Sequence, residues 1–135
     1  MTAWTYENEI VEQAPPDAVA FVYRITNMVD GRMYVGKKGL TMAKTKMVKG
    51  KKKKSRVESQ WRKYFGSNGE LQDDVKLLGP ENFKREVVRW CRSKAEASYH
   101  EARLQFVEDV LLSDRFYNRY IICRINAGHL QNIKI

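Results

Sequence analysis

Apolar, β-branched and aromatic residues gather in short runs separated by turn-forming residues over the first 40 positions of the chain. The run from Ala18 to Thr26 has the composition of a β-strand. Asp30-Gly31 supplies a two-residue turn of the type that closes hairpins, so Arg32 to Lys38 is expected to return as a second strand. A third strand is predicted over Phe83–Cys91.

A serine followed three residues later by a glutamate is a capping box, which predicts a helix start, and this pattern occurs twice. Ser55 to Glu58 is expected to open a helix that carries Trp61 and Phe65 and ends at Gly66. A shorter helix is expected over residues 70–78, because Gly79-Pro80 would end it.

The second capping box, Ser93 to Glu96, predicts the longest helix of the chain, which should run to about Leu112. Four residues at three- and four-residue spacing are expected to form its buried stripe: Tyr99, Ala102, Phe106 and Val110. A last strand over 119–126 would precede a tail over 127–135. This order of elements predicts an α+β domain, a small sheet with helices packed around it.

The length of 135 residues allows one domain, and 43% hydrophobic residues supply enough apolar material for a core. No apolar run approaches the roughly 18 residues of a membrane span, and the N-terminus lacks the pattern of a signal peptide. Two cysteines fit a reducing compartment. We therefore expect a cytoplasmic protein that does not contact a membrane.

The net charge of +9 is distributed unevenly along the chain. Residues 1–20 contain four acidic residues and no Lys or Arg, whereas residues 32–64 contain thirteen Lys or Arg and one Glu. A basic block of this density favours a polyanionic partner, and the aromatic residues that follow it favour nucleic acid. A solvated flexible loop and a loop that binds an acidic protein are the alternatives.

The expected hairpin would bring two phenols and an ammonium group together. With a two-residue turn, Tyr23 lies opposite Lys38 and Tyr34 lies opposite Asn27, all on one face of the hairpin with Gly36. Lys38 would then favour ionisation of Tyr23, and Gly36 would leave room for a substrate. The alternative is an ordinary aromatic hairpin that packs a core.

Phe21-Val22-Tyr23 and, after a span of ten residues, Tyr34-Val35-Gly36 resemble the paired tripeptides of the GIY-YIG nucleases. Later segments are similar to that family in the same order: Gln60 to Phe65, Asn82 to Val88, Glu101, and Tyr117-Asn118. The similarity covers residues 18–126. It implies a three-stranded antiparallel sheet flanked by helices, with a basic loop insertion over 39–55, between an acidic arm over 1–17 and the C-terminal tail.

The resemblance also implies a site. Tyr23 or Tyr34 would be or assist the general base, and Glu101 would hold one Mg²⁺ or Mn²⁺ ion per active site. Asn118 would orient Glu101 or a water. Gln60 stands where the family carries an arginine, so Arg56 or Lys38 is expected to contact the phosphate.

The implied function is a metal-dependent DNA endonuclease, homing- or restriction-like, of phage or mobile-element type, with a homodimer as the means of cutting both strands. The alternative is a basic nucleic-acid-binding protein without catalysis. The candidate DNA contacts are Lys37, Lys44, Lys46, Lys51, Lys52, Lys53, Lys54, Trp61, Arg62, Lys63, Tyr64, Ser67 and His100.

Overall fold

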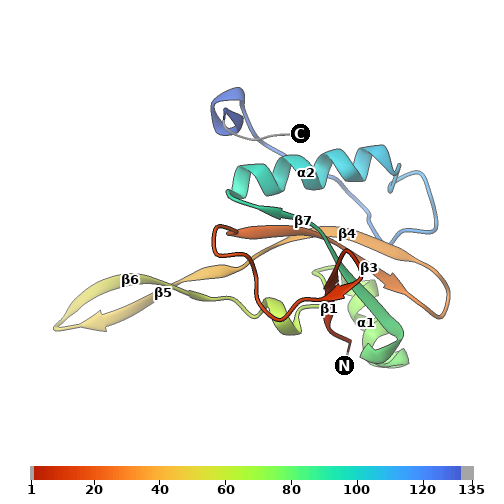
Figure 1. The fold of residues 1–135 in the computed structure, drawn as a ribbon, viewed down its shortest axis with the longest axis horizontal. Helices are drawn as coiled ribbons and strands as arrows, with labels where there is room; N and C mark the ends of the chain where they lie inside the picture. The colour runs from red at the N-terminus through yellow and green to blue at the C-terminus, as the bar shows by residue number, and fades with distance from the viewer. Residues whose placement is uncertain (1, 132–135) are drawn as a thin grey trace.

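The protein is described from a computed structural model, in which residues 2–131 are placed. A five-stranded sheet in the order β2-β1-β7-β3-β4 forms its centre (Figure 1). Its strands are β1 (Trp4–Tyr6), β2 (Glu9–Ile10), β3 (Ala20–Asn27), β4 (Met33–Gly39) and β7 (Phe83–Cys91). The helices are α1 (Gly69–Leu78) and α2 (Lys94–Val107), and the short 3₁₀ turns are η1 (Trp61–Lys63), η2 (Pro80–Asn82) and η3 (Ala127–Leu130).

The sheet has five strands rather than the three expected, because the acidic N-terminal segment joins it. β1 runs parallel to β7, with Trp4 beside Arg85, and pairs antiparallel with β2. The Trp4 side chain is 2% exposed and belongs to the main core, where its indole N–H donates to the Trp61 carbonyl at 2.8 Å. Within residues 2–17, β1 and β2 therefore supply two strands of the sheet.

The β3–β4 hairpin forms, but its register differs by two residues from the expected one. Tyr23 pairs with Gly36, and Phe21 pairs with Lys38. The shift has a local cause: the Asn27 side chain accepts a hydrogen bond from the Val29 N–H, which lengthens the turn. Because the shift is an even number of residues, the side chains keep their expected faces, but Lys38 no longer lies opposite Tyr23.

The basic segment is a second hairpin, so the helix expected to open at Ser55 is wrong. β5 (Thr41–Val48) and β6 (Lys51–Glu58) pair antiparallel along their whole length. Lys49 and Gly50 form the turn with positive φ values of 51° and 75°, as a two-residue turn of the primed type requires. Only the 3₁₀ turn η1 follows, so Trp61 does not lie on an α-helix.

Helix α2 begins where its capping box predicts, since the Ser93 hydroxyl accepts from the Glu96 N–H at 3.0 Å. It ends at Val107 rather than Leu112. Of the expected stripe, Ala102 is buried in the helix and Val110 is buried just after it, whereas Phe106 is 65% exposed. The other buried positions of the helix are Ala97, His100 and Gln105. The expected strand over 119–126 is absent from the described part of the chain, where this segment is extended without a ladder.

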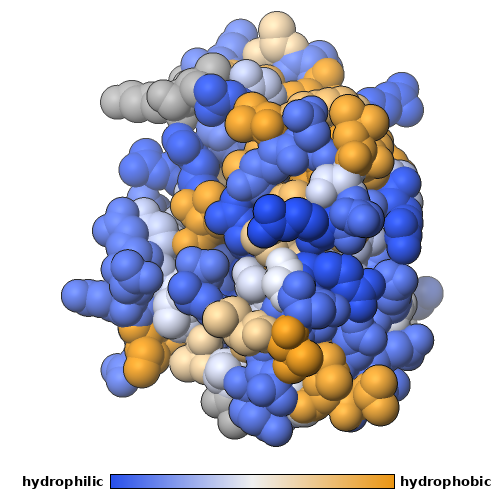
Figure 2. Space-filling view, turned by 90° about the vertical axis from the view of Figure 1, so that its right-hand side faces the viewer, coloured by the Kyte–Doolittle hydropathy of each residue, from blue (hydrophilic) through white to orange (hydrophobic). Residues whose placement is uncertain are grey.

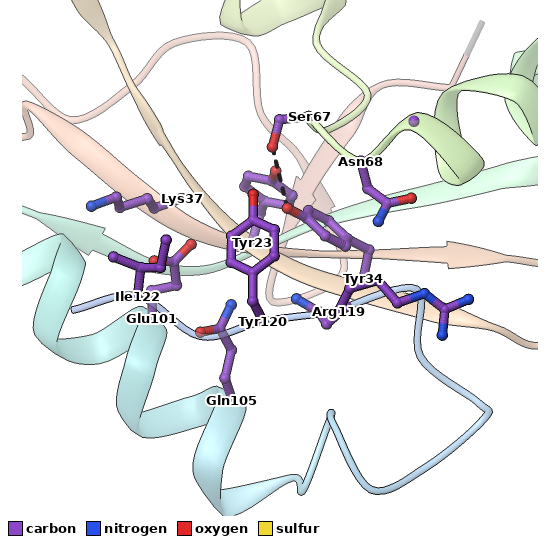
Figure 3. Close-up of a pocket in the computed structure, with 12 residues that line it drawn as sticks. Tyr23, Tyr34, Lys37, Ser67, Asn68, Glu101, Gln105, Arg119, Tyr120 and Ile122 are labelled. Carbon is purple, nitrogen blue, oxygen red and sulfur yellow. Dashed lines mark hydrogen bonds between the residues drawn. The ribbon is translucent and has the colours of Figure 1, made fainter.

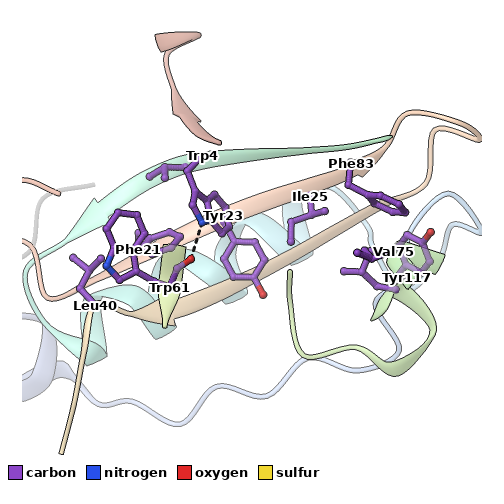
Figure 4. Close-up of a cluster of buried hydrophobic side chains, with 11 residues drawn as sticks. Trp4, Phe21, Tyr23, Ile25, Leu40, Trp61, Val75, Phe83 and Tyr117 are labelled. Carbon is purple, nitrogen blue, oxygen red and sulfur yellow. Dashed lines mark hydrogen bonds between the residues drawn. The ribbon is translucent and has the colours of Figure 1, made fainter. Parts of the chain in front are cut away.

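Two cores lie on opposite faces of the sheet, as the alternation of side chains along β3 requires. Phe21, Tyr23 and Ile25 face η1 and α1 in one core, which Figure 4 shows with its Trp4–Trp61 hydrogen bond. Val22 faces α2 in the other core, with Cys91. The sheet therefore separates two helical layers, and β4 is its edge strand.

Two further observations concern the surface. No helix among residues 2–131 is long and apolar enough to cross a membrane. The end of the molecule that faces away from the β5–β6 hairpin is mainly hydrophilic, and its hydrophobic residues lie in separate groups rather than in one continuous face (Figure 2).

Candidate active site

A cavity of about 440 Å³ lies at the edge strand β4 (Figure 3). Because β4 ends the sheet, side chains from both faces can reach around this edge, and the cavity brings together β3, β4, α2 and the segment after Phe116. It is lined by Tyr23, Tyr34, Lys37, Ser67, Asn68, Gly69, Glu101, Gln105, Asn118, Arg119, Tyr120 and Ile122. Four residues expected in the site, Tyr23, Tyr34, Glu101 and Asn118, are among them.

Tyr23 is fully buried, and its ring fills the space that Gly36 leaves empty. A Cβ atom at Gly36 would lie 2.5 Å from the Tyr23 hydroxyl. The ring also packs edge-on against Trp4 and Tyr64, with centroid distances of 5.5 and 5.8 Å. The Tyr23 hydroxyl has no hydrogen-bond partner among the described residues.

The phenols of Tyr23 and Tyr34 are both harder to ionise than a free tyrosine. Burial, followed by the nearby phenols of Tyr64 and Tyr34, raises the pKa of Tyr23 well above its ordinary value. Burial also raises the pKa of Tyr34, against the opposite effect of its hydrogen bond with the Ser67 hydroxyl at 3.2 Å. The expected ionisation of Tyr23 by Lys38 is therefore wrong, and the Lys38 ammonium lies 4.4 Å from the centre of the Tyr64 ring.

Glu101 enters the cavity from the sheet-facing side of α2, four residues after Ala97 and four before Gln105, so these three share one helical face. Burial raises the pKa of Glu101, and the Lys37 ammonium and backbone N–H partly oppose this. A half-buried carboxylate is a hard oxygen ligand of the kind that Mg²⁺ prefers. Residues 2–131 hold no cluster of three or more acidic, His or Cys side chains, so a cation here would take its remaining ligands from water or substrate.

The free edge of β4 is covered by side-chain amides. The Asn118 carbonyl oxygen accepts from the Val35 N–H at 3.1 Å, and its NH₂ group donates to the Val35 carbonyl at 2.8 Å. Gln105 donates to the same carbonyl at 2.9 Å. The Asn118 amide thus takes the place of a neighbouring strand and positions β4. Its hydrogen bonds within residues 2–131 go to Val35 and not to Glu101, which was one of the two partners expected for it.

Sequence reasoning missed several residues that line this site, including Gln105, Asn68 and Arg119. Gln105 lies one helical turn after Glu101, a spacing that would have placed both in one cavity. Asn68 caps α1 by accepting from the Leu71 N–H, and it donates to the Tyr117 carbonyl, which ties the Ser67 loop to the segment beside β4.

The structure places several expected DNA contacts outside the cavity. Trp61 is 2% exposed and His100 is 6% exposed, so neither presents a surface to a partner. His100 faces a separate cavity of about 220 Å³ between α2 and β7. Arg62 donates to the Glu12 carbonyl at 2.6 Å.

A neighbouring cavity of about 390 Å³ is lined by Lys38, Lys63 and Tyr64, together with Gln60. Arg56, the other cation expected to contact a phosphate, lies in β6 and donates to the Thr41 hydroxyl at 2.9 Å. The remaining candidates also lie in β5 and β6, and all are exposed: Lys44, Lys46, Lys51, Lys52, Lys53 and Lys54.

Comparison with known proteins identifies a family. The model of the family described as "Putative endonuclease segE, GIY-YIG domain" matches residues 4–121. The curated protein "Putative endonuclease segE" of Enterobacteria phage T4 is 24% identical over 98 residues, which cover 73% of this chain and 39% of that protein. The chain thus spans about two fifths of the length of this relative. No solved structure matches.

Proposed function

We propose, because the chain belongs to the GIY-YIG domain family of the segE type, that it is a metal-dependent DNA endonuclease that hydrolyses phosphodiester bonds. One observation carries the proposal: Tyr23, Tyr34 and Glu101, which come from β3, β4 and α2, line the same cavity. Buried phenols and a carboxylate at a solvent-open edge supply the groups of a hydrolytic site, whereas a core aromatic hairpin would not need the glutamate.

Phosphodiester hydrolysis requires an oriented and deprotonated water, neutralisation of the charge on the phosphate, and assistance to the departing oxygen. Glu101 would hold one Mg²⁺ or Mn²⁺ ion, which when bound supplies positive charge to the phosphate. The geometry fits such an ion because Glu101 is half-buried beside a cavity with room for waters and a phosphate.

The two tyrosines orient the reactants. In the resting site both phenols are protonated, because burial raises both pKa values. The Tyr23 hydroxyl, unpartnered among the described residues, is assigned to the attacking water, while Tyr34 and Ser67 form a hydroxyl pair for a phosphate oxygen. Either phenol can act as general base only after positive charge nearby has lowered its pKa.

Cations at the cavity would receive the phosphate. Lys37 and Arg119 both line it, whereas Arg56 and Lys38 lie outside. Arg119 is held at 3.2 Å from a carboxylate oxygen of Glu70, and its side chain is 67% exposed, so it can reach toward a ligand. We assign the phosphate contact to Lys37 and Arg119 instead of to the two cations expected from sequence.

Several finer points extend the proposal. The substrate is DNA, cutting is homing- or restriction-like, and a homodimer would cut both strands. The exposed lysines of β5 and β6 supply affinity for the phosphate backbone. The protein would act in the cytoplasm of a bacterial or phage-infected cell.

Nicking of supercoiled plasmid in the presence of Mg²⁺ tests the proposal. Glu101→Gln should abolish nicking, and Tyr23→Phe and Tyr34→Phe should each reduce its rate at least 100-fold, as loss of a reactant-orienting group does. Asp73→Asn on the exposed face of α1 and Tyr99→Phe on α2 are matched controls outside the cavity, and both should leave the rate unchanged. Nicking that survives Glu101→Gln would overturn the site.

The exposed basic hairpin favours a second candidate function, a nucleic-acid-binding protein without catalysis. The two are separated by a gel shift in EDTA beside the nicking assay. A salt-dependent shift with no nicking under Mg²⁺ or Mn²⁺ would favour the second candidate. Nicking that requires Glu101 would exclude it.

A further inference from the structure

The β5–β6 hairpin projects from the body of the molecule (Figure 1). Every residue of its two strands is exposed except Val48 and Val57, which are partly buried. The ladder is nonetheless unbroken, from Thr41 beside Glu58 to Val48 beside Lys51. The hairpin is therefore a regular two-stranded ribbon without a core of its own.

The charge on this ribbon opposes its folding. Residues 41–58 hold eight Lys or Arg and one Glu. Lys46 lies directly opposite Lys53, and like charges in that position destabilise a sheet. An isolated hairpin is marginal in water even without such repulsion. A polyanion that neutralises the lysines would remove this cost.

The root of the ribbon is fixed to the body. Leu40 is 5% exposed, and its N–H donates to the Val19 carbonyl at 2.9 Å. Ser59 closes the other strand: its N–H donates to the Leu40 carbonyl at 2.9 Å and its hydroxyl donates to the Gly39 carbonyl at 2.5 Å. β4, which carries Tyr34 and Lys37 of the cavity, thus continues through Leu40 into β5.

The dimensions fit one kind of duplex groove. Two paired strands are about 5 Å apart, and eight residues of strand span about 26 Å. The major groove of undistorted B-form DNA, about 12 Å wide, admits a two-stranded ribbon, whereas the minor groove, about 6 Å wide, would have to be widened to do so. The major groove of A-form RNA is too narrow and deep for side chains to read.

We propose that the β5–β6 hairpin enters the major groove of duplex DNA, with its lysines against the flanking phosphates, and so holds a phosphate at the cavity of β4. This inference rests on the proposed function, since it takes DNA as the substrate. A ribbon of this length would cover on the order of eight base-pair steps. Lys44, Lys46, Lys51 and Lys53 share one face of it, because their positions alternate in register along the two strands.

Duplex binding in EDTA tests the inference without any cleavage. A variant with Lys44, Lys46, Lys51 and Lys53 changed to Gln loses four charges from the hairpin. The matched control changes Lys84, Lys94, Arg103 and Arg115, four exposed cations of the body, to Gln. Thermal melting should show both variants folded, because none of these side chains is buried.

At about 0.15 M salt the hairpin variant should bind duplex DNA at least 100-fold more weakly, and its log–log salt slope should fall by about 3.6, which is 0.9 for each phosphate that the variant no longer neutralises. The control should change affinity less than threefold. Methyl green, a dye of the major groove, should compete with the protein, and netropsin, a ligand of the minor groove, should not. The affinity for duplex RNA should be the same in both variants.

Three results would overturn the inference: equal losses in the two variants, competition by netropsin, or an equal loss of binding to duplex RNA. Its failure is distinguishable from failure of the proposed function. If nicking depends on Glu101 but both variants lose the same affinity, the protein is a nuclease and the hairpin does not enter the groove. If the hairpin binds the major groove but the unchanged protein does not nick DNA, the inference about the hairpin stands and the proposed nuclease function fails.

Discussion

The cavity at β4 and the β5–β6 hairpin are joined through Leu40, but different physical forces shape them. Tyr23 is fully buried, and the phenols of Tyr23 and Tyr34 stay neutral because burial disfavours their ionisation. The hairpin lysines are exposed and charged, and packing holds none of them. Packing thus fixes the proposed catalytic groups, whereas the proposed DNA contact of the hairpin depends on its exposed charge and on the shape of the ribbon. Substitutions in the cavity should therefore leave duplex binding unchanged, and substitutions in the hairpin should leave the structure of the cavity unchanged.

The largest expected effect concerns the core below the cavity. Trp4→Ala should lower the free energy of unfolding by about 3–5 kcal/mol, because it removes a buried aromatic that packs on Phe21 and Tyr23. Chemical denaturation measures this change in the free energy of unfolding. Ile10→Ala in the same segment, 69% exposed, should cost less than about 0.5 kcal/mol. Equal small losses would mean that the N-terminal segment does not belong to the core.

The next effect separates positioning in the cavity from binding by the hairpin. Gly36→Ala would place a Cβ atom 2.5 Å from the Tyr23 hydroxyl, and the surrounding rings leave Tyr23 no room to retreat. We expect nicking to fall about 100-fold, as it does when a reacting group moves by about 1 Å. Duplex affinity in EDTA should stay within twofold.

Gly69→Ala is the matched control for this prediction. Gly69 also lines the cavity, but a Cβ atom there meets nothing within 4 Å. It should leave nicking unchanged. If Gly36→Ala nicks normally, Tyr23 does not need the position that the structure gives it.

A smaller loss of stability is expected when the Asn118 amide, which covers the edge of β4, is removed. Asn118→Ala leaves the N–H of Val35 buried without its partner, which should cost about 1–3 kcal/mol of stability. Nicking should fall as well, whereas Lys37 and the hairpin should still bind DNA. Asn118→Asp keeps an acceptor for the Val35 N–H but sets a second, charged oxygen against the Val35 carbonyl, so it should recover little of the stability at neutral pH. Full stability in Asn118→Ala, with nicking lost, would instead give Asn118 a direct part in catalysis.

Much of the cavity could be predicted from sequence because its parts follow simple periodicities. Tyr23 and Tyr34 lie on one face of the hairpin as expected, despite the error in register. A shift by an even number of residues leaves every side chain on its own face. The second capping box begins α2 and so places Glu101 on a helix, although the role of Glu101 in the site came from the resemblance to the nuclease family. These relations are local, so the chain order alone determines them.

The errors have a common physical source in packing and in side-chain hydrogen bonds. Ser55 to Glu58 matches a capping box, yet pairing with Thr41 to Lys44 holds it in a strand. Trp4 lies in an acidic segment, and only its contact with β7 and Trp61 reveals a core residue. Likewise the expected pairing of Lys38 with Tyr23 fails because the Asn27 side chain lengthens the turn. Hydrophobic periodicity and capping patterns carry no information about strand pairing, contacts between distant segments or side-chain hydrogen bonds in turns.

The ionisation of the phenols gives a further test of how the cavity differs from the hairpin. A pKa raised in the folded state stabilises the protein below about pH 10, and that stability is lost as pH rises through the raised value. In an ultraviolet titration of tyrosinate, Tyr23→Phe should therefore remove amplitude only above pH 10. Tyr117→Phe should do the same near the value of about 12 to which burial raises the pKa of Tyr117. Amplitude lost below pH 10 in Tyr23→Phe would mean that nearby lysines outweigh burial.

The smallest expected effect lies within the hairpin and has opposite signs for folding and binding. Lys53→Glu turns the repulsive pair with Lys46 into an attractive one, which should stabilise the ribbon by about 0.3 kcal/mol in this exposed setting. Slower amide hydrogen exchange in β5 and β6 would measure it, with no change in the melting of the body. Lys84→Glu is the control, because Lys84 lies outside the hairpin. Duplex affinity should fall in Lys53→Glu despite the better-ordered ribbon, since the proposed complex needs the charge of Lys53 against a phosphate. A rise would mean that the order of the ribbon, and not its charge, limits binding.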